Sequence, residues 1–473
     1  MADDTELDSH RFDPTILREY DIRGTVDKNL HQRDAWALGR AFGSQLREAG
    51  ASTVCVARDG RASSPLLEAA LVNALRDSGI EVWRLGLGPT PMLYFATVTL
   101  QAGGGVMVTG SHNPADMNGF KMMLGGRAFW GEDIKRIGAI AASGAWGEKA
   151  KGHARGKVEM RDLLTDYVNA IANAYKPGRE LKVAWDAGNG AAGEAMARVT
   201  KRLPGEHILL YEKIDASFPN HHPDPTVPAN LADLIETVRR RKCDVGIAFD
   251  GDGDRIGVVD SEGRILWGDQ LLVILARELL ARRPGETVIA DVKASQVLFD
   301  EIARAGGRPL MWKTGHSLIK SKMVETGAPL AGEMSGHIFY GDGWYGFDDA
   351  LYAAIRLLSI LSNSDKSLAE MRDGLPSVVN TPELRIECAE DRKFAIVGEV
   401  AARLRKDGAK VDDVDGVRVN TEDGWWLLRA SNTQAVLVAR CEGRDAACVK
   451  RLEEALKAQL TASGIAFNLS AGH

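Results

Sequence analysis

An acidic, glycine-rich segment spans residues 250–255 and reads Asp-Gly-Asp-Gly-Asp-Arg, directly after an apolar run. Glycine lets the backbone curl, so the carboxylates of Asp250, Asp252 and Asp254 can converge on one cation. An EF-hand loop is excluded, because its sixth position here is arginine and its twelfth is serine. Carboxylates this close repel one another unless a cation joins them. The segment therefore predicts a site for Mg²⁺, Ca²⁺ or Mn²⁺, which prefer hard oxygen ligands, and not for Zn²⁺.

A polar loop at residues 109–114 reads Thr-Gly-Ser-His-Asn-Pro and follows the apolar residues 106–108. At the exit of a strand, Ser111 could be presented as a nucleophile, with His112 beside it. The loop is not a nucleophile elbow, because it lacks the pattern G-x-S-x-G. Lys121 could supply a cation next to a phosphorylated serine. Taken alone, a polar turn explains this loop equally well.

Two further segments could bind a phosphorylated sugar. Glu333, Ser335 and His337 alternate along residues 332–337, so they could offer hydrogen bonds to neighbouring sugar hydroxyls. Residues 429–433, Arg-Ala-Ser-Asn-Thr, combine a guanidinium, two hydroxyls, an amide and loop N–H groups that suit a phosphate. Taken alone, a capped polar turn explains this last segment equally well.

These segments lie where short apolar runs alternate with longer helical patterns, which indicates βα units and a mostly parallel or mixed sheet. The expected strands cover residues 53–57, 106–109, 182–185, 245–249 and 287–290. The expected helices cover residues 65–78, 163–174, 231–241 and 269–282. In open α/β sheets, ligands bind outside the carboxyl ends of the strands. An apolar strand runs into an Asp/Gly-rich loop three times, at residues 56–60, 184–188 and 248–252, which hints at duplicated α/β domains.

Composition shifts suggest where the domains end. A Gly/Ala/Lys-rich stretch covers residues 142–157, and a charged segment with shorter strands begins near residues 376–382. We therefore expect domain boundaries near residue 157 and near residue 376.

The overall composition excludes several classes of protein. A formal net charge of −6 argues against general nucleic-acid binding. No apolar stretch is long enough to span a bilayer, and the acidic start does not resemble a signal peptide. Five scattered cysteines without a CxxC pair favour a reduced, cytoplasmic setting. Neither a Walker A motif nor a dinucleotide fingerprint is present, so ATP and NAD are not indicated.

The four motifs, in this order, resemble those of the α-D-phosphohexomutases, and most closely the bacterial phosphomannomutase/phosphoglucomutase branch. Residues 20–24, 218–225 and 312–320 are also similar to that family, so the resemblance covers nearly the whole chain. It implies an α/β fold with three related α/β domains that have mixed sheets, at residues 1–157, 158–262 and 263–376, plus a smaller C-terminal α+β domain at residues 377–473. These domains would carry in turn the serine loop (residues 109–114), the metal loop (250–255), the sugar loop (332–337) and the phosphate loop (429–433). It further implies a heart-shaped molecule with a central active-site cleft.

The resemblance also implies roles for individual residues. Ser111 would be a phosphoserine that, with Asp250, Asp252 and Asp254, binds Mg²⁺. The implied catalytic residues are Ser111, His112, Lys121, Arg255 and His316, with His316 and Arg255 as candidates for the general acid or base. The implied substrate-binding residues are Tyr20, Arg23, Lys293, His316, Glu333, Ser335, His337, Arg429, Ser431, Asn432 and Thr433.

The activity that the resemblance implies is reversible phosphoryl transfer between the 1- and 6-positions of mannose or glucose phosphate. Glucose 1,6-bisphosphate or mannose 1,6-bisphosphate would be both the intermediate and the activator that phosphorylates Ser111. Small hexose phosphates would be the only partners, with neither nucleic acid nor membrane, and the protein would be a monomer or a dimer. Three alternatives remain open at this point: a phosphoglucosamine mutase, a metal-dependent sugar phosphatase and a sugar-phosphate-binding protein without catalysis.

Overall fold

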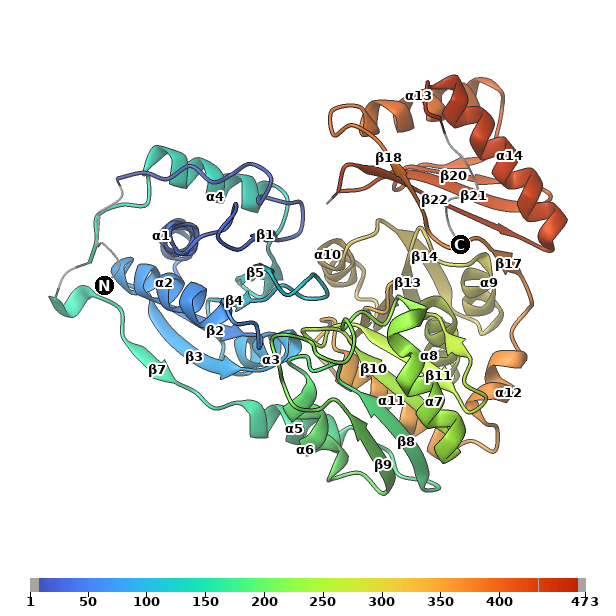
Figure 1. The fold of residues 1–473 in the computed structure, drawn as a ribbon, viewed down its shortest axis with the longest axis horizontal. Helices are drawn as coiled ribbons and strands as arrows, with labels where there is room; N and C mark the ends of the chain where they lie inside the picture. Colours follow the sequence, from blue (N-terminus) through green and yellow to red (C-terminus); the bar gives the residue numbers. More distant parts are fainter. Residues whose placement is uncertain (1–7, 151, 433, 467–473) are drawn as a thin grey trace.

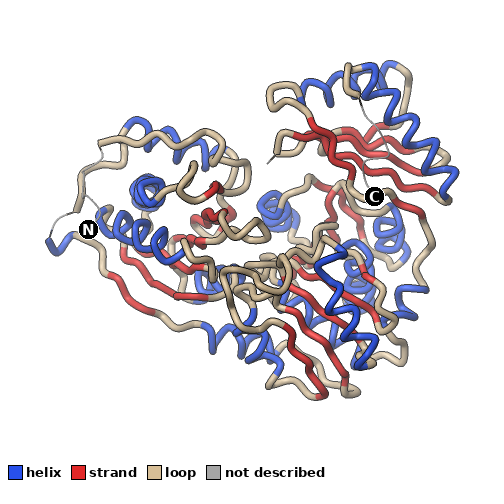
Figure 2. Tube along the Cα trace, viewed as in Figure 1, coloured by secondary structure: helices blue, strands red, loops and turns tan. Residues whose placement is uncertain are grey.

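The computed structural model describes residues 8–150, 152–432 and 434–466, and the strands of these residues form four sheets. Figure 1 shows the N-terminal part in blue and teal on one side and the C-terminal part in red on the other, with the green and yellow parts next to both. The loops that leave the sheets gather between these parts, in the middle of the molecule (Figure 2).

The first sheet has parallel strands flanked by antiparallel ones. Its order is β1 (Ile22–Thr25), β5 (Met117–Leu124), β4 (Gly104–Val108), β2 (Thr53–Arg58), β3 (Glu81–Leu87) and β7 (Val158–Met160), with β6 (Arg127–Ala128) paired to β5. Strands β4, β2, β3 and β7 are parallel, whereas β1, β5 and β6 pair antiparallel. The helices of this part are α1 (Gln32–Glu48), α2 (Ser64–Asp77), α3 (Thr90–Thr99) and α4 (Glu132–Ser143). Strand β7 extends the sheet three residues past the expected boundary at residue 157.

The second sheet repeats this mixed arrangement. Its order is β12 (Ile265–Leu266), β11 (Ile256–Asp260), β10 (Val245–Phe249), β8 (Leu181–Asp186) and β9 (Gly205–Leu210). Strands β10, β8 and β9 are parallel, and β11 and β12 pair antiparallel. The helical segments of this part are α5 (Leu164–Asn173), α6 (Gly193–Thr200), the short 3₁₀ helix η2 (Pro228–Leu231) and α7 (Ala232–Arg241). Another 3₁₀ helix, η1 (Gly152–Ala154), precedes β7.

The third sheet is shorter and of the same kind. Its order is β14 (Arg308–Trp312), β13 (Thr287–Asp291), β15 (Leu330–Gly332) and β16 (Ile338–Tyr340), in which only β16 is antiparallel to its neighbour. The helices of this part are α8 (Gly268–Arg282), α9 (Gln296–Arg304), α10 (His316–Thr326), α11 (Ala350–Ser362) and α12 (Leu368–Asp373).

The C-terminal sheet is antiparallel throughout. Its order is β17 (Val379–Asn380), β22 (Val436–Gly443), β21 (Gly424–Ala430), β20 (Val417–Asn420) and β19 (Val411–Asp412), with β18 (Leu384–Glu387) also paired to β22. Helices α13 (Lys393–Lys406) and α14 (Ala446–Ala462) belong to this part, which has its own apolar core. Three mixed α/β sheets and a smaller antiparallel α+β domain agree with the predicted fold class.

One structural unit recurs in the first three sheets. In each, a parallel strand turns back into an antiparallel neighbour: β4 into β5, β10 into β11, and β15 into β16. The serine loop, the metal loop and the sugar loop of the sequence are the three connections within these hairpins. Equivalent positions in repeated domains therefore bring together the three segments that carry the chemistry.

The apolar core explains how these hairpins are held in fixed positions. One continuous core includes side chains of α3, α5, β8, α8 and α11, and so joins the first three domains. The five cysteines are all buried and unbridged. In residues 8–150, 152–432 and 434–466, no helix combines the length and the apolar character needed to cross a bilayer.

Candidate active site

Ser111 lies in the β4–β5 connection with a backbone φ of 49°, a left-handed conformation that is uncommon outside glycine. The buried guanidinium of Arg61 holds this conformation. It donates hydrogen bonds to the carbonyl oxygens of Ser111 at 2.7 Å, Asn113 at 2.6 Å and Met117 at 2.9 Å. Asp59 balances its charge, with an Nε–Oδ2 distance of 3.1 Å. The serine is therefore positioned before any substrate binds.

The serine meets the metal loop directly. Its hydroxyl donates a hydrogen bond to Oδ2 of Asp250 at 3.0 Å, although 139 residues separate the two in sequence. A Cβ atom on Gly251 would lie 2.3 Å from the carbonyl oxygen of Ser111, so only glycine lets the two loops approach this closely. The other oxygen of Asp250 accepts hydrogen bonds from the backbone N–H groups of Gly253, Asp254 and Arg255 at 3.0, 3.1 and 3.1 Å.

The three aspartates of the metal loop are fully buried. Lys121 lies between two of them, with Nζ at 2.7 Å from Oδ2 of Asp252 and 2.5 Å from Oδ2 of Asp254. Burial disfavours its charge, but these carboxylates outweigh burial and raise the pKa of Lys121. For Asp250, burial and the neighbouring carboxylates raise the pKa. For Asp254, burial acts in the same direction, but Lys121 outweighs it and the pKa is lowered.

The metal loop fits a hard divalent cation. One oxygen of each of Asp250, Asp252 and Asp254 lies within 4.8 Å of the others. Oδ1 of Asp252 is buried and has no hydrogen-bond partner among the described residues, while its Oδ2 already binds Lys121 and the hydroxyl of Thr90, at 2.6 Å. An unpaired carboxylate oxygen in the interior costs free energy that a cation would recover.

The sugar loop packs onto the metal loop. Arg255 and His337 form an isolated β-bridge, and the N–H of Ile256 donates to the carbonyl of Gly336 at 3.0 Å. Nε2 of His337 lies 3.3 Å from Oδ1 of Asp254. The predicted sugar-binding residue His337 therefore lies beside the metal ligands.

The pKa values of two histidines in this region, His337 and His316, are shifted in opposite directions. Burial opposes charge on His337, but mainly Asp254 outweighs it and raises the pKa of His337 to about 9. Burial and then Lys320 lower the pKa of His316 well below its usual value. Their rings lie 5.6 Å apart, centroid to centroid. At neutral pH the site thus contains one protonated and one neutral imidazole.

Glu333 anchors the same loop. Its Oε1 accepts a hydrogen bond from the N–H of Gly315 at 2.6 Å, and its Oε2 lies 2.8 Å from Nδ1 of His337. Burial opposes its charge, but His337 outweighs burial and lowers the pKa of Glu333. Ser335 is close to the same imidazole, with an Oγ–Nδ1 distance of 3.2 Å.

The predicted phosphate loop adjoins the sugar loop through Tyr20 and Asp415. The amide of Asn432 donates to the hydroxyl of Tyr20 at 2.5 Å, and this hydroxyl donates to the carbonyl of Thr314 at 2.7 Å. Asp415 accepts from Nε of Arg429 and from the N–H of Thr314, both at 3.0 Å. Residues of the first, third and fourth domains therefore meet here.

Lys293, Arg23 and Ser431, three further predicted residues, are each held by a neighbouring group. Lys293 pairs with Glu383 at 3.0 Å, and this ammonium lowers the pKa of Glu383 to about 2. Arg23 is buried and pairs with Asp21. Ser431 is buried, and its Oγ accepts a hydrogen bond from the N–H of Gln434 at 3.2 Å. Thr433 lies outside the described residues.

Sequence reasoning missed several residues of this site. Arg61 directly follows the Asp/Gly-rich loop at residues 56–60, which the sequence analysis identified, but no pattern indicated that its side chain binds the carbonyl groups of the serine loop. Asp348, buried with Oδ1 at 2.8 Å from Nζ of Lys320, was also missed. A pair of adjacent aspartates before an apolar helix was the available signal. Thr90 and Asp415 carried no signal at all.

Comparison with known proteins agrees with this geometry. Family models for phosphoglucomutase/phosphomannomutase match alpha/beta/alpha domain I at residues 14–147, domain II at 165–263, domain III at 267–378 and the C-terminal domain at 383–459. A phosphomannomutase/phosphoglucomutase of Pseudomonas putida is 45% identical over 446 residues, which cover 94% of this chain and 95% of that protein. A phosphoglucomutase of Neisseria meningitidis is 44% identical over 445 residues, 94% of this chain and 96% of that protein.

A crystal structure of a phosphoglucomutase/phosphomannomutase family protein from Burkholderia thailandensis superposes with a TM-score of 0.90 at 42% identity. The superposition covers 97% of this chain and 99% of the Burkholderia chain. Matches of this extent include all four domains and every motif described above. The chain therefore belongs to the phosphoglucomutase/phosphomannomutase family, as the resemblance of its motifs predicted.

Proposed function

We propose that this protein interconverts the 1- and 6-phosphates of mannose, glucose or both, through a phosphorylated Ser111 and a hexose 1,6-bisphosphate. The names of the relatives in Pseudomonas and Neisseria support the reaction. The contact between Ser111 and Asp250 at 3.0 Å supports the serine as the group that carries the phosphoryl. This contact is the observation on which the mechanism depends, because it brings a nucleophile to a metal loop.

In the proposed first step, the phosphoryl group of Ser111 passes to the free hydroxyl of a bound hexose monophosphate. The P–O bond to the serine breaks, a P–O bond to the sugar forms, the sugar hydroxyl proton moves to a nearby base, and the serine oxygen takes up a proton to become a hydroxyl again. His316 is suited to accept it, because burial keeps its imidazole neutral. The bisphosphate then turns over and returns its other phosphoryl group to Ser111.

Phosphoryl transfer depends mainly on alignment and on neutralising negative charge. Asp250, Asp252 and Asp254 would hold Mg²⁺ together with an oxygen of the phosphoserine. The ion would supply charge neutralisation at the transferring group. Lys121, Arg255 and His112 would add further contacts to this phosphate.

The opposite end of the substrate needs its own anion site. Arg429, Ser431, Asn432 and Thr433 would bind the phosphate that is not transferred, and Tyr20, Arg23 and Lys293 would line the space between the two ends. Glu333, Ser335 and His337 would bind the sugar hydroxyls. Two phosphate sites on either side of a sugar site suit a mutase, which must accept its intermediate in both orientations. The monomeric or dimeric state stays a prediction.

Phosphorus NMR tests this proposal. The protein, with Mg²⁺ and a trace of glucose 1,6-bisphosphate as activator, is given glucose, mannose and glucosamine 1-phosphates in turn. We expect conversion of the glucose or mannose compound to its 6-phosphate. Conversion of the glucosamine compound alone would reassign the substrate, and release of inorganic phosphate would mean a phosphatase.

A further inference from the structure

A proline-rich loop of the second domain, residues 218–225, reads Phe-Pro-Asn-His-His-Pro-Asp-Pro and connects β9 to η2. Its prolines fix the backbone φ and so limit the conformations that this proline loop can adopt. His221 attaches it to the end of β8, since Nε2 lies 3.0 Å from Oδ2 of Asp186. Pro223 and Pro225 are buried. The proline loop is therefore preformed, although it carries no group assigned to the reaction.

One side chain of the proline loop binds the serine loop directly. Nε2 of His222 lies 2.5 Å from the carbonyl oxygen of His112, the residue next to Ser111. Because a carbonyl oxygen only accepts, Nε2 of His222 carries the proton and donates it. The two histidines are 110 residues apart in sequence. This hydrogen bond therefore connects the second domain to the peptide that follows the proposed nucleophile.

This contact completes the support of the serine loop. The carbonyl oxygens of the four consecutive residues 111–114 all accept hydrogen bonds from side chains. Arg61 binds the first at 2.7 Å, the third at 2.6 Å and also the fourth, and His222 binds the second, which Arg61 leaves. The guanidinium of Arg61 in turn lies 5.3 Å from the ring centroid of Phe218. The proline loop thus contacts both the serine loop and the arginine that holds it.

The next residue of the proline loop binds the metal loop. The carbonyl oxygen of Pro223 accepts a hydrogen bond from the N–H of Gly251 at 3.1 Å. A Cβ atom on Gly251 would lie 2.3 Å from the carbonyl oxygen of Ser111 and 3.4 Å from Cγ of Pro223. Gly251 is therefore enclosed by the serine loop and the proline loop. The consecutive residues His222 and Pro223 each bind one of the two loops that meet at the serine.

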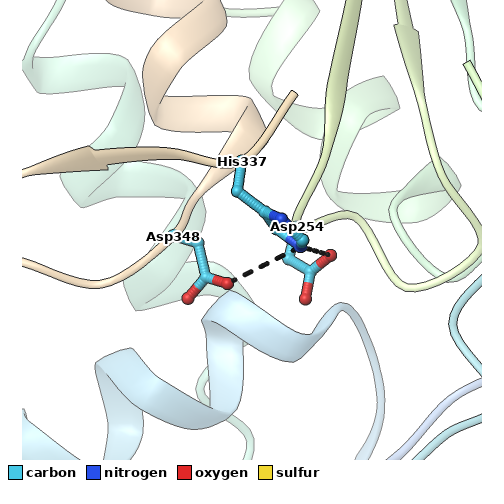
Figure 3. Close-up of side chains that lie close together, drawn as sticks. All are labelled: Asp254, His337 and Asp348. Atoms are coloured by element: carbon cyan, nitrogen blue, oxygen red, sulfur yellow. Dashed lines mark ion pairs between the residues drawn. The ribbon is translucent and has the colours of Figure 1, made fainter. Parts of the chain in front are cut away.

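The third domain holds the other end of the metal loop. There the imidazole of His337 lies between the carboxylates of Asp254 and Asp348 (Figure 3), with Nε2 3.3 Å from Oδ1 of Asp254. The hydrogen bond from the proline loop reaches the opposite end, next to Asp250. Its effect should therefore fall on the contact between Ser111 and Asp250, and not on the groups that face the sugar.

We propose that His222 is a positioning residue for phosphoryl transfer, which together with the carbonyl of Pro223 fixes the separation between Ser111 and Asp250. The inference rests on the proposed function, because it assigns His222 to the step in which the phosphoryl group leaves or returns to the serine. The role requires only an N–H donor at the position of Nε2. Glutamine places an amide N–H at a similar distance from the backbone, whereas leucine has no donor.

Steady-state kinetics of matched variants test this role. We expect His222→Leu to lower kcat about 10- to 100-fold with little change in KM, because a small displacement of the nucleophile slows the transfer without weakening sugar binding. His222→Gln should recover most of this loss. His207→Leu is the control, since this histidine of the same domain also binds a backbone carbonyl, that of Pro204 at 3.2 Å. Wild-type kcat in His222→Leu, a loss in KM instead of kcat, or equal losses in His222→Leu and His222→Gln would overturn the proposal.

Amide hydrogen exchange tests the positioning without any activity. The N–H groups of Gly110, Ser111 and Asn113 are hydrogen-bonded within the first domain at 3.0, 2.8 and 3.0 Å. Peptides that cover residues 109–117 should exchange about tenfold faster in His222→Leu than in the wild type or His222→Gln. If the leucine variant does not fold, His222→Asn replaces it, because its amide is one methylene shorter than that of glutamine. Unchanged exchange would overturn the proposal, whereas faster exchange in a protein without mutase activity would refute the proposed function alone.

Discussion

Replacing Arg61 by lysine keeps the charge but removes the planar fork that clamps the serine loop. The guanidinium of Arg61 is bound by the carbonyls of Ser111, Asn113 and Met117 and by Asp59. A single ammonium cannot reach all of these acceptors. If roughly three hydrogen bonds of about 1 kcal/mol are lost, Arg61→Lys destabilises the first domain by about 3 kcal/mol.

That loss sets the size of two measurable effects. For a domain of this size, 1 kcal/mol lowers Tm by about 2–4 °C, so calorimetry should show a decrease of about 6–12 °C. We also expect kcat to fall about 10- to 100-fold, equivalent to about 1.4–2.8 kcal/mol, because Ser111 is no longer fixed in its left-handed conformation. KM should change little, since the hydrogen bonds of Arg61 go to the serine loop, to Met117 and to Asp59, and not to a predicted substrate residue.

Arg136→Lys is the matched control in the same domain. Its guanidinium is 55% exposed and pairs with Glu48 on the surface, where such pairs contribute about 0–1 kcal/mol. Steady-state assays and calorimetry should not distinguish it from the wild type. Wild-type kcat together with unchanged Tm in Arg61→Lys would refute the clamp. A lower Tm with unchanged kcat would reduce Arg61 to a purely structural role.

Three other predictions concern the metal, the phosphate and a buried acid. Asp252→Asn should raise the Mg²⁺ concentration needed for half-maximal rate at least tenfold without changing the circular dichroism spectrum, and an unchanged Mg²⁺ dependence would contradict the ligand assignment. Arg429→Lys should raise KM for hexose phosphates about tenfold or more, because lysine cannot make a bidentate contact with the phosphate that is not transferred. The bisphosphate should still phosphorylate Ser111 in this variant, and an unchanged KM would mean that the phosphate that is not transferred binds elsewhere. Burial raises the pKa of Asp349 to about 7, compared with about 3.9 in the unfolded chain. Because the folded state binds this proton more tightly, its free energy of unfolding falls between pH 4 and pH 8, by an amount on the order of 4 kcal/mol. Asp349→Asn keeps a helix-capping oxygen and should therefore exceed the wild type in Tm at pH 8 but not at pH 4; a difference that does not vary with pH would contradict this.

The sequence predicts the regular elements closely where they are buried. The strand expected at residues 245–249 is β10 (Val245–Phe249), and the helix expected at residues 269–282 is α8 (Gly268–Arg282). Buried strands and amphipathic helices are readable because burial gives them a local pattern. Strand β7 (Val158–Met160) was not predicted, since this short edge strand is mostly exposed and has no such pattern.

The residues of the site also differ in how far the sequence alone predicts their roles. The metal loop could be predicted from its own residues, because three carboxylates separated by glycines have little other explanation. The resemblance to a known family linked Ser111 to that loop, since local patterns do not reveal contacts across 139 residues. Arg61 and Asp348 act through tertiary contacts alone. His337 was predicted to bind sugar, and only the fold shows that its Nε2 also faces Asp254.

The most direct test of the central claim is a single turnover from the serine. Protein labelled with radioactive phosphate by a hexose 1,6-bisphosphate is freed of that compound and mixed with unlabelled glucose or mannose 1-phosphate. We expect one label per chain, located on Ser111 by mass spectrometry, to move to the sugar as bisphosphate, and Ser111→Ala to take up none. Label that leaves as inorganic phosphate, or uptake by Ser111→Ala equal to the wild type, would contradict a mutase that acts through this serine.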